Sequence, residues 1–214
     1  MIDVAKIANA MGELDENAVL EVINQIMAEG GGAAQEALAA CQKGLGIVGD
    51  KFESGEYFVA DLIYAGAVMT EAVGLLKPAL ASEGATSSRG KMILCTVKDD
   101  LHDIGKNIVK SMLEAASFDV LDLGIDVAPE TVVSKAKEEG ITIIALSGVL
   151  TLALESMKAT VEAFKAAGMR ECVHIIIGGI PVNEEACKYV GADAWAHSPQ
   201  VTVRTCEGWS AGPA

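Results

Sequence analysis

The sequence predicts an all-α four-helix unit followed by an α/β domain that contains a five-stranded parallel sheet. Up to about position 80, apolar residues recur at helical spacing, and residues 82–88 are then small and polar. Beyond them, short apolar runs alternate with amphipathic stretches, which is the pattern of a parallel sheet covered on both faces. The expected boundaries are 1–82 for the helical unit, 83–90 for a linker and 91–214 for the α/β domain.

Four helices are expected in the first unit. The clearest begins near Leu14, carries apolar residues at positions 19, 20, 22, 23, 26 and 27, and ends at glycines 30–32. A short helix precedes Gly12, a third covers about 33–52, and a fourth covers about 58–80. Residues 44–49 spell GxGxxG, a dinucleotide-binding pattern, but they follow a helical segment rather than a strand. We therefore interpret these glycines as small residues for close helix packing.

The second unit is expected to be a doubly wound sheet. Strands are predicted at 92–97, 120–123, 141–146, 173–177 and 192–196, and helices at 104–116, 129–139, 152–167 and 184–190. In the flavodoxin-like strand order 2-1-3-4-5, strands 1, 3 and 4 are neighbours. Ligands bind such sheets beyond the carboxyl ends of the strands, where the strand order reverses. A ligand site is therefore expected in the loops after these three strands.

Composition excludes several classes of function. The chain has 16 basic and 30 acidic residues, a net charge of −14, which argues against nucleic acid or an anionic membrane as the main partner. No uncharged apolar stretch reaches the ~18 residues of a membrane helix, and the N-terminus does not resemble a signal peptide, so a cytoplasmic protein is expected. The five cysteines form no CxxC pair, which favours reduced, buried thiols over disulfides or zinc.

The three predicted loops carry a distinctive set of residues. The first reads Asp99-Asp100-Leu101-His102-Asp103-Ile104-Gly105, the second contains Ser147, Val149 and Thr151, and the third is Gly178-Gly179. In this order they resemble the cobalamin-binding module, with its motif DxHxxG…SxL…GG, of methionine synthase, adenosylcobalamin mutases and small corrinoid methyl carriers. The resemblance covers about 89–203. Residues 48–52 and 55–58 resemble the helical cap of the methyl-transferring members. Val149 departs from the motif, which has Leu there.

The resemblance implies a cobalamin cofactor in its methylcobalamin form, with His102 as the lower ligand of cobalt. A neutral imidazole needs an acceptor on its second nitrogen, and Asp100 in the same loop can supply it. In the family the histidine displaces the benzimidazole of the cofactor, whose nucleotide tail enters the sheet. Gly105 and a helix N-terminus suit the phosphate of that tail. By resemblance, the other loop residues quoted above are also cofactor contacts.

The implied function is that of a methyl carrier that is not catalytic alone. Its partners would be a donor:corrinoid methyltransferase and a second methyltransferase that delivers to tetrahydrofolate or coenzyme M. Phe52, Val59 and Leu62 match residues that cover the reactive face of cobalt in methionine synthase, although they could equally form bundle core. Two other functions stay open: the small subunit of an adenosylcobalamin mutase, which generally lacks the helical half, and a corrinoid-dependent sensor, which would carry a DNA-binding unit.

Individual residues also have simpler interpretations. His102 could be an ordinary loop histidine, and Asp99, Asp100 and Asp103 could bind a divalent metal, although acids at a helix start explain them more simply. His174 falls in an apolar strand run and is expected to be a buried structural residue. His197, after the last strand, lies near the expected site without a defined role.

Overall fold

The computed structural model describes residues 4–82 and 88–210. The chain divides into two compact units, Met1–Ser87 and Ser88–Ala214. Residues 83–87 of the predicted linker lie outside the described residues.

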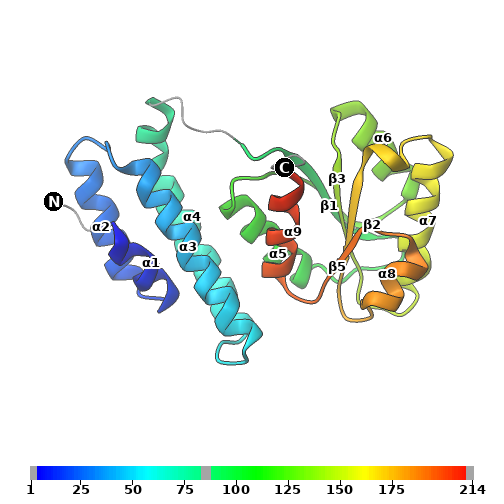
Figure 1. Ribbon diagram of the computed structural model, residues 1–214, viewed down its shortest axis with the longest axis horizontal. Helices are drawn as coiled ribbons and strands as arrows, with labels where there is room; N and C mark the ends of the chain where they lie inside the picture. Colours follow the sequence, from blue (N-terminus) through cyan, green and yellow to red (C-terminus); the bar gives the residue numbers. More distant parts are fainter. Residues whose placement is uncertain (1–3, 83–87, 211–214) are drawn as a thin grey trace. The chain divides into compact units, whose positions relative to one another are not determined.

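Four helices make up the described part of the first unit (Figure 1): α1 Ala5–Gly12, α2 Glu16–Ala28, α3 Ala34–Glu53 and α4 Val59–Ser82. The predicted helices are confirmed. Asp15 caps α2 by accepting the N–H of Ala18, and Gly30 and Gly31 follow this helix with positive φ, a conformation that favours glycine.

The GxGxxG segment lies inside α3, as the packing interpretation requires. A Cβ atom on Gly44 would lie 2.4 Å from Cβ of Met11 on α1, so only glycine allows this close approach of the two helices. The segment precedes no phosphate-binding turn, and the dinucleotide interpretation is excluded by its helical context.

Helix α4 is long and apolar enough, by length and composition, to cross a membrane, and it is the one such helix among the residues that the structure describes. Its buried residues recur every three or four positions along one side: Leu62, Ala65, Val68, Met69, Ala72 and Leu76. Glu71 and Lys77 are exposed. A one-sided stripe of this kind is typical of a core helix in a bundle.

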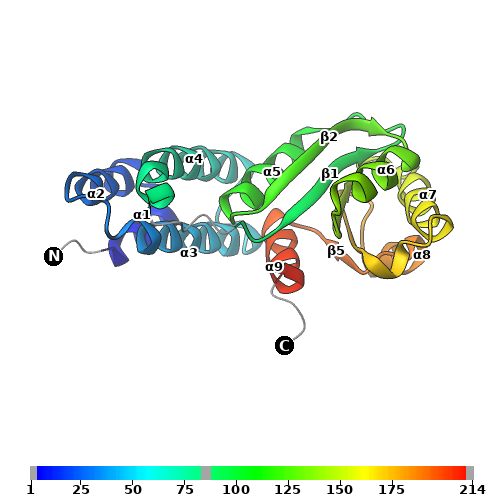
Figure 2. The ribbon, with the colours of Figure 1, turned by 90° about the horizontal axis from the view of Figure 1, so that it is seen from above.

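The second unit contains a five-stranded, all-parallel sheet in the order β2-β1-β3-β4-β5. Its strands are β1 Lys91–Val97, β2 Asp119–Val127, β3 Ile143–Ser147, β4 His174–Gly178 and β5 Ala194–Ala196. Figures 1 and 2 show α5 (Ile104–Ala115) and α9 (Pro199–Ser210) on one face, and α6 (Pro129–Glu139), α7 (Ala153–Ala166) and α8 (Glu184–Val190) on the other. The predicted fold class and strand order are confirmed.

Two elements differ from the prediction. β2 extends to Val127, beyond the predicted 120–123: Gly124 and Asp126 interrupt the apolar run in the sequence, but Gly124 pairs with Cys95 of β1 and Asp126 bonds to Thr96. The other is α9, which was not predicted. Its sequence is rich in Thr, Val and polar residues and lacks a clear apolar repeat.

Side chains alternate between the two faces of the sheet. Ile93, Cys95 and Val97 of β1 belong to the core beneath α6, α7 and α8, together with Ile144, Leu146, Ile175 and Ile177 from β3 and β4. The intervening residues, such as Met92, Leu94 and Thr96, therefore face α5 and α9.

Candidate functional site

The three predicted loops meet at the carboxyl edge of the sheet. Thr96 at the end of β1 pairs with Ser147 at the end of β3, which pairs with Gly178 at the end of β4. The N–H of Gly148 also donates to the carbonyl oxygen of Gly178 over 3.1 Å. The residues that sequence spacing selected are thus brought together by neighbouring strands.

Asp100 is the centre of this arrangement and is fully buried. Its Oδ1 accepts the backbone N–H of His102 over 3.0 Å and lies 3.1 Å from Nδ1 of the same residue. Its Oδ2 accepts the N–H groups of Val149 and Leu150 over 2.7 and 3.1 Å. One carboxylate therefore fixes the histidine and joins the loop after β1 to the loop after β3.

The charge of Asp100 determines the tautomer of His102. Burial opposes the charged form, but the hydrogen bonds from His102, Val149 and Leu150 outweigh it and lower the pKa of the Asp100 carboxyl below its ordinary value. A carboxylate only accepts hydrogen bonds, so Nδ1 of the neutral imidazole carries the proton and Nε2 has the free lone pair. Because the His102 side chain is 51% exposed, this nitrogen is available to a ligand.

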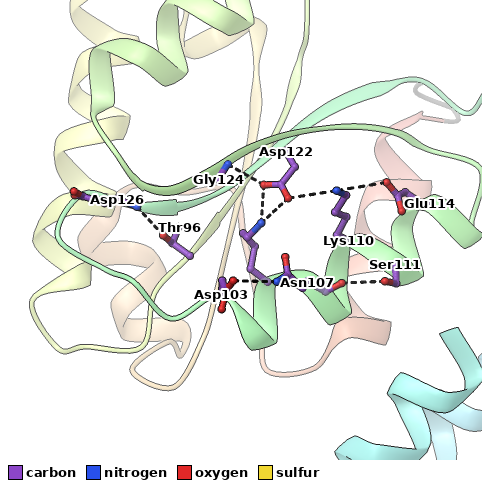
Figure 3. Close-up of polar contacts among 10 residues, drawn as sticks. Thr96, Asp103, Asn107, Lys110, Ser111, Glu114, Asp122, Gly124 and Asp126 are labelled. Carbon is purple, nitrogen blue, oxygen red and sulfur yellow. Dashed lines mark hydrogen bonds and ion pairs between the residues drawn. The ribbon is translucent and has the colours of Figure 1, made fainter. Parts of the chain in front are cut away.

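The end of β2 braces the histidine loop, a role that sequence reasoning missed. The N–H of Asp126 donates to Oγ1 of Thr96 over 3.0 Å (Figure 3). The same N–H donates to the carbonyl oxygen of Asp100 over 3.1 Å. Its Oδ1 accepts the N–H of Asp99 and Nζ of Lys98. Asp99 and Asp126 both have positive φ, and these bonds hold them there. The feature of the sequence that could have indicated this role is an acidic residue, Asp126, near the end of the strand beside β1.

A buried ion pair anchors the start of α5 to β2. Nζ of Lys106, which is 3% exposed, lies 2.6 Å from both carboxylate oxygens of Asp122. Figure 3 shows Lys110 also directed toward Asp122, at 3.5 Å. Burial opposes the charge of Asp122, but Lys106 and the N–H of Gly124 lower the pKa of its carboxyl. The Lys106–Asp122 pair fixes the helix that begins beside His102. This pair was not predicted from the sequence.

Exposed apolar side chains lie on the same edge of the sheet as the histidine. They range from Leu150 at 43% exposure to Ile180 at 82%, and the set is Leu101, Ile104, Ile125, Leu150, Leu152 and Ile180. They come from the loops after β1, β3 and β4 and from the end of β2. A concentration of exposed aliphatic groups marks a binding surface. We call this set the apolar rim; Ile125, Leu150, Leu152 and Ile180 were not predicted.

A row of small residues crosses the sheet below the rim. Thr96, Ser147, Gly178 and Ala196 are register partners on four neighbouring strands. By alternation this row faces α5 and α9. A Cβ atom on Gly178 would meet only the carbonyl oxygen of Ala196, at 3.6 Å, and one on Gly105 would meet nothing within 4 Å. The chain therefore leaves space here that larger side chains would fill.

Glycine is required at position 179 for a separate, structural reason. Its φ is +125°, and a Cβ atom would lie 1.8 Å from the carbonyl oxygen of Gly148. The contact between the loops after β3 and β4 thus requires glycine at this position, whatever ligand binds beside it.

The remaining predicted residues have varied environments. Val149 is half-buried and Thr151 is exposed. Asp103 precedes α5 but caps it with no side-chain hydrogen bond; its carboxylate accepts from Asn107 instead. Among the described residues, no three His, Cys, Asp or Glu side chains are placed to hold a metal ion. His197 is exposed, with its ring 5.8 Å from that of Trp195.

The prediction that His174 is buried was wrong. It is the first residue of β4 and is exposed, with its ring stacked 4.9 Å from that of Trp209 on α9. A residue at the start of a strand lies at the edge of the sheet, where an apolar run in the sequence does not guarantee burial.

The cysteines are all free, as predicted. Burial raises the pKa of the Cys41, Cys95 and Cys206 thiols to about 12, which makes them unreactive at neutral pH. Cys172 is exposed.

Within the helical unit, the predicted cap residues lie at the end of α3 and the start of α4. Leu62 is buried in the bundle, Phe52 is half-buried and Val59 is exposed. Phe58 and Ile63 beside them are also exposed, at 71% and 53%. The start of α4 therefore presents an apolar surface, while Leu62 contributes to the core.

Comparisons with known proteins match both units of the chain. A sequence profile described as B12 binding domain matches residues 90–203, and a second profile with the same description matches residues 4–77. The crystal structure of a cobalamin-binding protein from Desulfitobacterium hafniense DCB-2 is 48% identical with a TM-score of 0.88, and the match covers 98% of this chain and 99% of the other.

Two curated relatives are similar over most of their length. A corrinoid protein of Desulfitobacterium hafniense strain Y51 is 34% identical over 88% of each chain. Dimethylamine corrinoid protein 1 of Methanosarcina acetivorans is 35% identical, over 93% of this chain and 85% of the relative.

Proposed function

The chain belongs to the corrinoid proteins with a B12 binding domain, and we propose that it binds cobalamin through His102 and carries a methyl group between two partner enzymes. The observation that carries this proposal is the half-exposed His102 imidazole. Its Nδ1 is engaged by the buried Asp100 carboxylate, and the apolar rim lies on the same edge of the sheet. A flat, largely apolar macrocycle with a metal at its centre matches an imidazole nitrogen on an edge that also exposes aliphatic groups.

When bound, the corrinoid supplies a cobalt centre that accepts a methyl group from one molecule and yields it to another. The residues of the chain hold and tune that centre. His102 would hold the cobalt through Nε2, and ionised Asp100 keeps the proton on Nδ1 and raises the donor strength of the ring. The rim residues Leu101, Ile104 and Leu150 would exclude water from the bound macrocycle.

The row of small residues suits the nucleotide tail. Space beside Gly105 and Gly178 would take the benzimidazole and ribose, with the Ser147 hydroxyl in the same row. Because Asp103 does not cap α5, the first N–H groups of this helix remain available to the tail phosphate. Val149 provides an apolar side chain at the position where the family motif has Leu.

The partners we propose are a donor-specific methyltransferase and a second methyltransferase that delivers to tetrahydrofolate or coenzyme M. The exposed apolar surface of Phe58, Val59 and Ile63, with Phe52, would cover the reactive face of the cofactor between transfers. We propose a cytoplasmic location. The helical half favours a methyl carrier over the mutase subunit, and its 13 acidic against 4 basic residues up to position 88 disfavour a DNA-binding sensor.

Reconstitution tests the binding step. The cofactor-free chain is mixed with hydroxocobalamin, desalted and scanned in the visible range, and we expect a coloured protein with one cofactor per chain. His102→Ala should shift this spectrum because the axial nitrogen is lost, whereas His197→Ala, also exposed but after β5, should not. A wild-type chain that stays colourless would reject cobalamin binding.

The transfer step needs a separate assay. The reduced, cofactor-loaded chain is incubated with cell extract and a panel of methyl donors: methanol, methylamines including dimethylamine, a betaine and a methoxylated aromatic. We expect one donor class to methylate the cofactor. If none does, while an adenosylated cofactor is isolated from the native source, the mutase alternative replaces the carrier.

A further inference from the structure

Gln200 carries an unexplained buried oxygen. The residue is 8% exposed, and its Oε1 has no hydrogen-bond partner. Among the residues that the structure describes, it is the one buried side-chain nitrogen or oxygen in this condition. An amide oxygen removed from water without a partner destabilises the fold, so such an atom calls for an explanation.

Gln200 lies on the helix that covers the row of small residues, close in sequence to the end of that row. It lies in the first turn of α9, which begins three residues after Ala196, the last residue of β5 and the end of that row. Gln200, Val203 and Cys206 are buried at a spacing of three, so they share the side of α9 that packs on the rest of the unit. α9 covers the face of the sheet toward which the side chains of Thr96 and Ser147 point, and Gly178 belongs to the same register row.

We propose that Oε1 of Gln200 accepts a hydrogen bond from a ribose hydroxyl in the nucleotide tail of the bound cobalamin. The inference rests on the proposed function and adds a residue, on an element the sequence did not predict, that distinguishes corrinoids with a complete tail from those without one. The unpartnered oxygen of the cofactor-free chain becomes satisfied only when the tail is in place.

The test compares two corrinoids on one variant. Gln200→Met keeps the length of the side chain and removes the acceptor. Affinities of the full chain for hydroxocobalamin and for aquacobinamide, which lacks the ribose and base, are measured by spectral titration. Thermal unfolding of the cofactor-free chain is measured in parallel. The matched control is Gln35→Met, because Gln35 is an exposed helical glutamine in the other unit.

We expect Gln200→Met to weaken hydroxocobalamin binding about tenfold, the change in Kd that corresponds to ~1.4 kcal/mol, and to leave cobinamide binding unchanged. The Tm of the cofactor-free chain should stay the same or rise by about 2 °C, because an unsatisfied polar atom is removed. Gln35→Met should change neither affinity.

Three results overturn the inference. An unchanged affinity for hydroxocobalamin removes Gln200 from the cofactor contacts. Equal losses for both corrinoids, or a lowered Tm, make it a structural residue of α9. If the wild-type chain binds no cobalamin, the proposed function fails and this inference with it; if wild type binds and the variant binds equally well, only this inference fails.

Discussion

Replacing Asp100 by Asn tests the central claim about the site, that one buried carboxylate holds two loops together. The wild-type carboxylate accepts from His102 with one oxygen and from Val149 and Leu150 with the other. An amide has one oxygen only. If its NH₂ group takes the Oδ2 position, the N–H groups of Val149 and Leu150 lose their acceptor; if it takes the Oδ1 position, the backbone N–H of His102 loses its acceptor.

The expected loss of stability follows from these bonds. Each buried donor left without a partner costs about 1–3 kcal/mol, so one or two give about 1–6 kcal/mol, and we expect about 2–4 kcal/mol for the cofactor-free chain. The matched control is Asp99→Asn. Its side chain is 77% exposed and pairs only with Lys98 at 3.3 Å, so it should cost at most about 0.5 kcal/mol.

The dependence on pH gives an independent check. Because the folded-state pKa of Asp100 is lowered, its contribution to stability is complete above the unfolded value of about 3.9 and is lost as the pH falls through the folded pKa. The gap between wild type and Asp100→Asn should be constant between about pH 5 and 7 and narrow below about pH 4. Urea unfolding at a series of pH values measures it. A gap under about 0.5 kcal/mol at pH 7 would refute the reasoning.

Two further changes test other parts of the site. Lys106→Met leaves the partly buried Asp122 carboxylate without its main partner, and we expect a loss of about 3 kcal/mol in urea unfolding; a variant as stable as wild type would show that the pair does not anchor α5. Gly179→Ala forces a Cβ atom to 1.8 Å from the Gly148 carbonyl and should lower the Tm of the cofactor-free chain by several degrees. Gly178→Ala should leave that Tm near wild type but weaken hydroxocobalamin binding; if the two glycine variants behave alike, the distinction between a loop contact and a space for the tail is wrong.

The sequence was sufficient for the strand order and for the pairing of Asp100 with His102, because both depend on local patterns. Buried strands appear as short apolar runs, and an aspartate two residues before a histidine can reach its ring within one loop. The order β2-β1-β3-β4-β5 was predicted as the flavodoxin-like member of the two common doubly wound orders.

The parts that could not be predicted depend on contacts between distant segments. Asp126 braces the histidine loop only because β2 lies beside β1, and the need for glycine at position 179 arises from a carbonyl group on the loop after β3. α9 is held by packing on the sheet rather than by a strong helical repeat of its own. His174 was misplaced because residue type predicts burial poorly at the first position of a strand.

The two oxygens of Asp100 serve different loops, one the loop of His102 and the other the loop that follows Ser147. A single proton on this group would therefore disturb the imidazole and the far loop at once, although about 50 residues of sequence separate them. For a bound corrinoid, attachment at the metal and attachment of the base would then fail together on acidification, as one cooperative release instead of two successive steps.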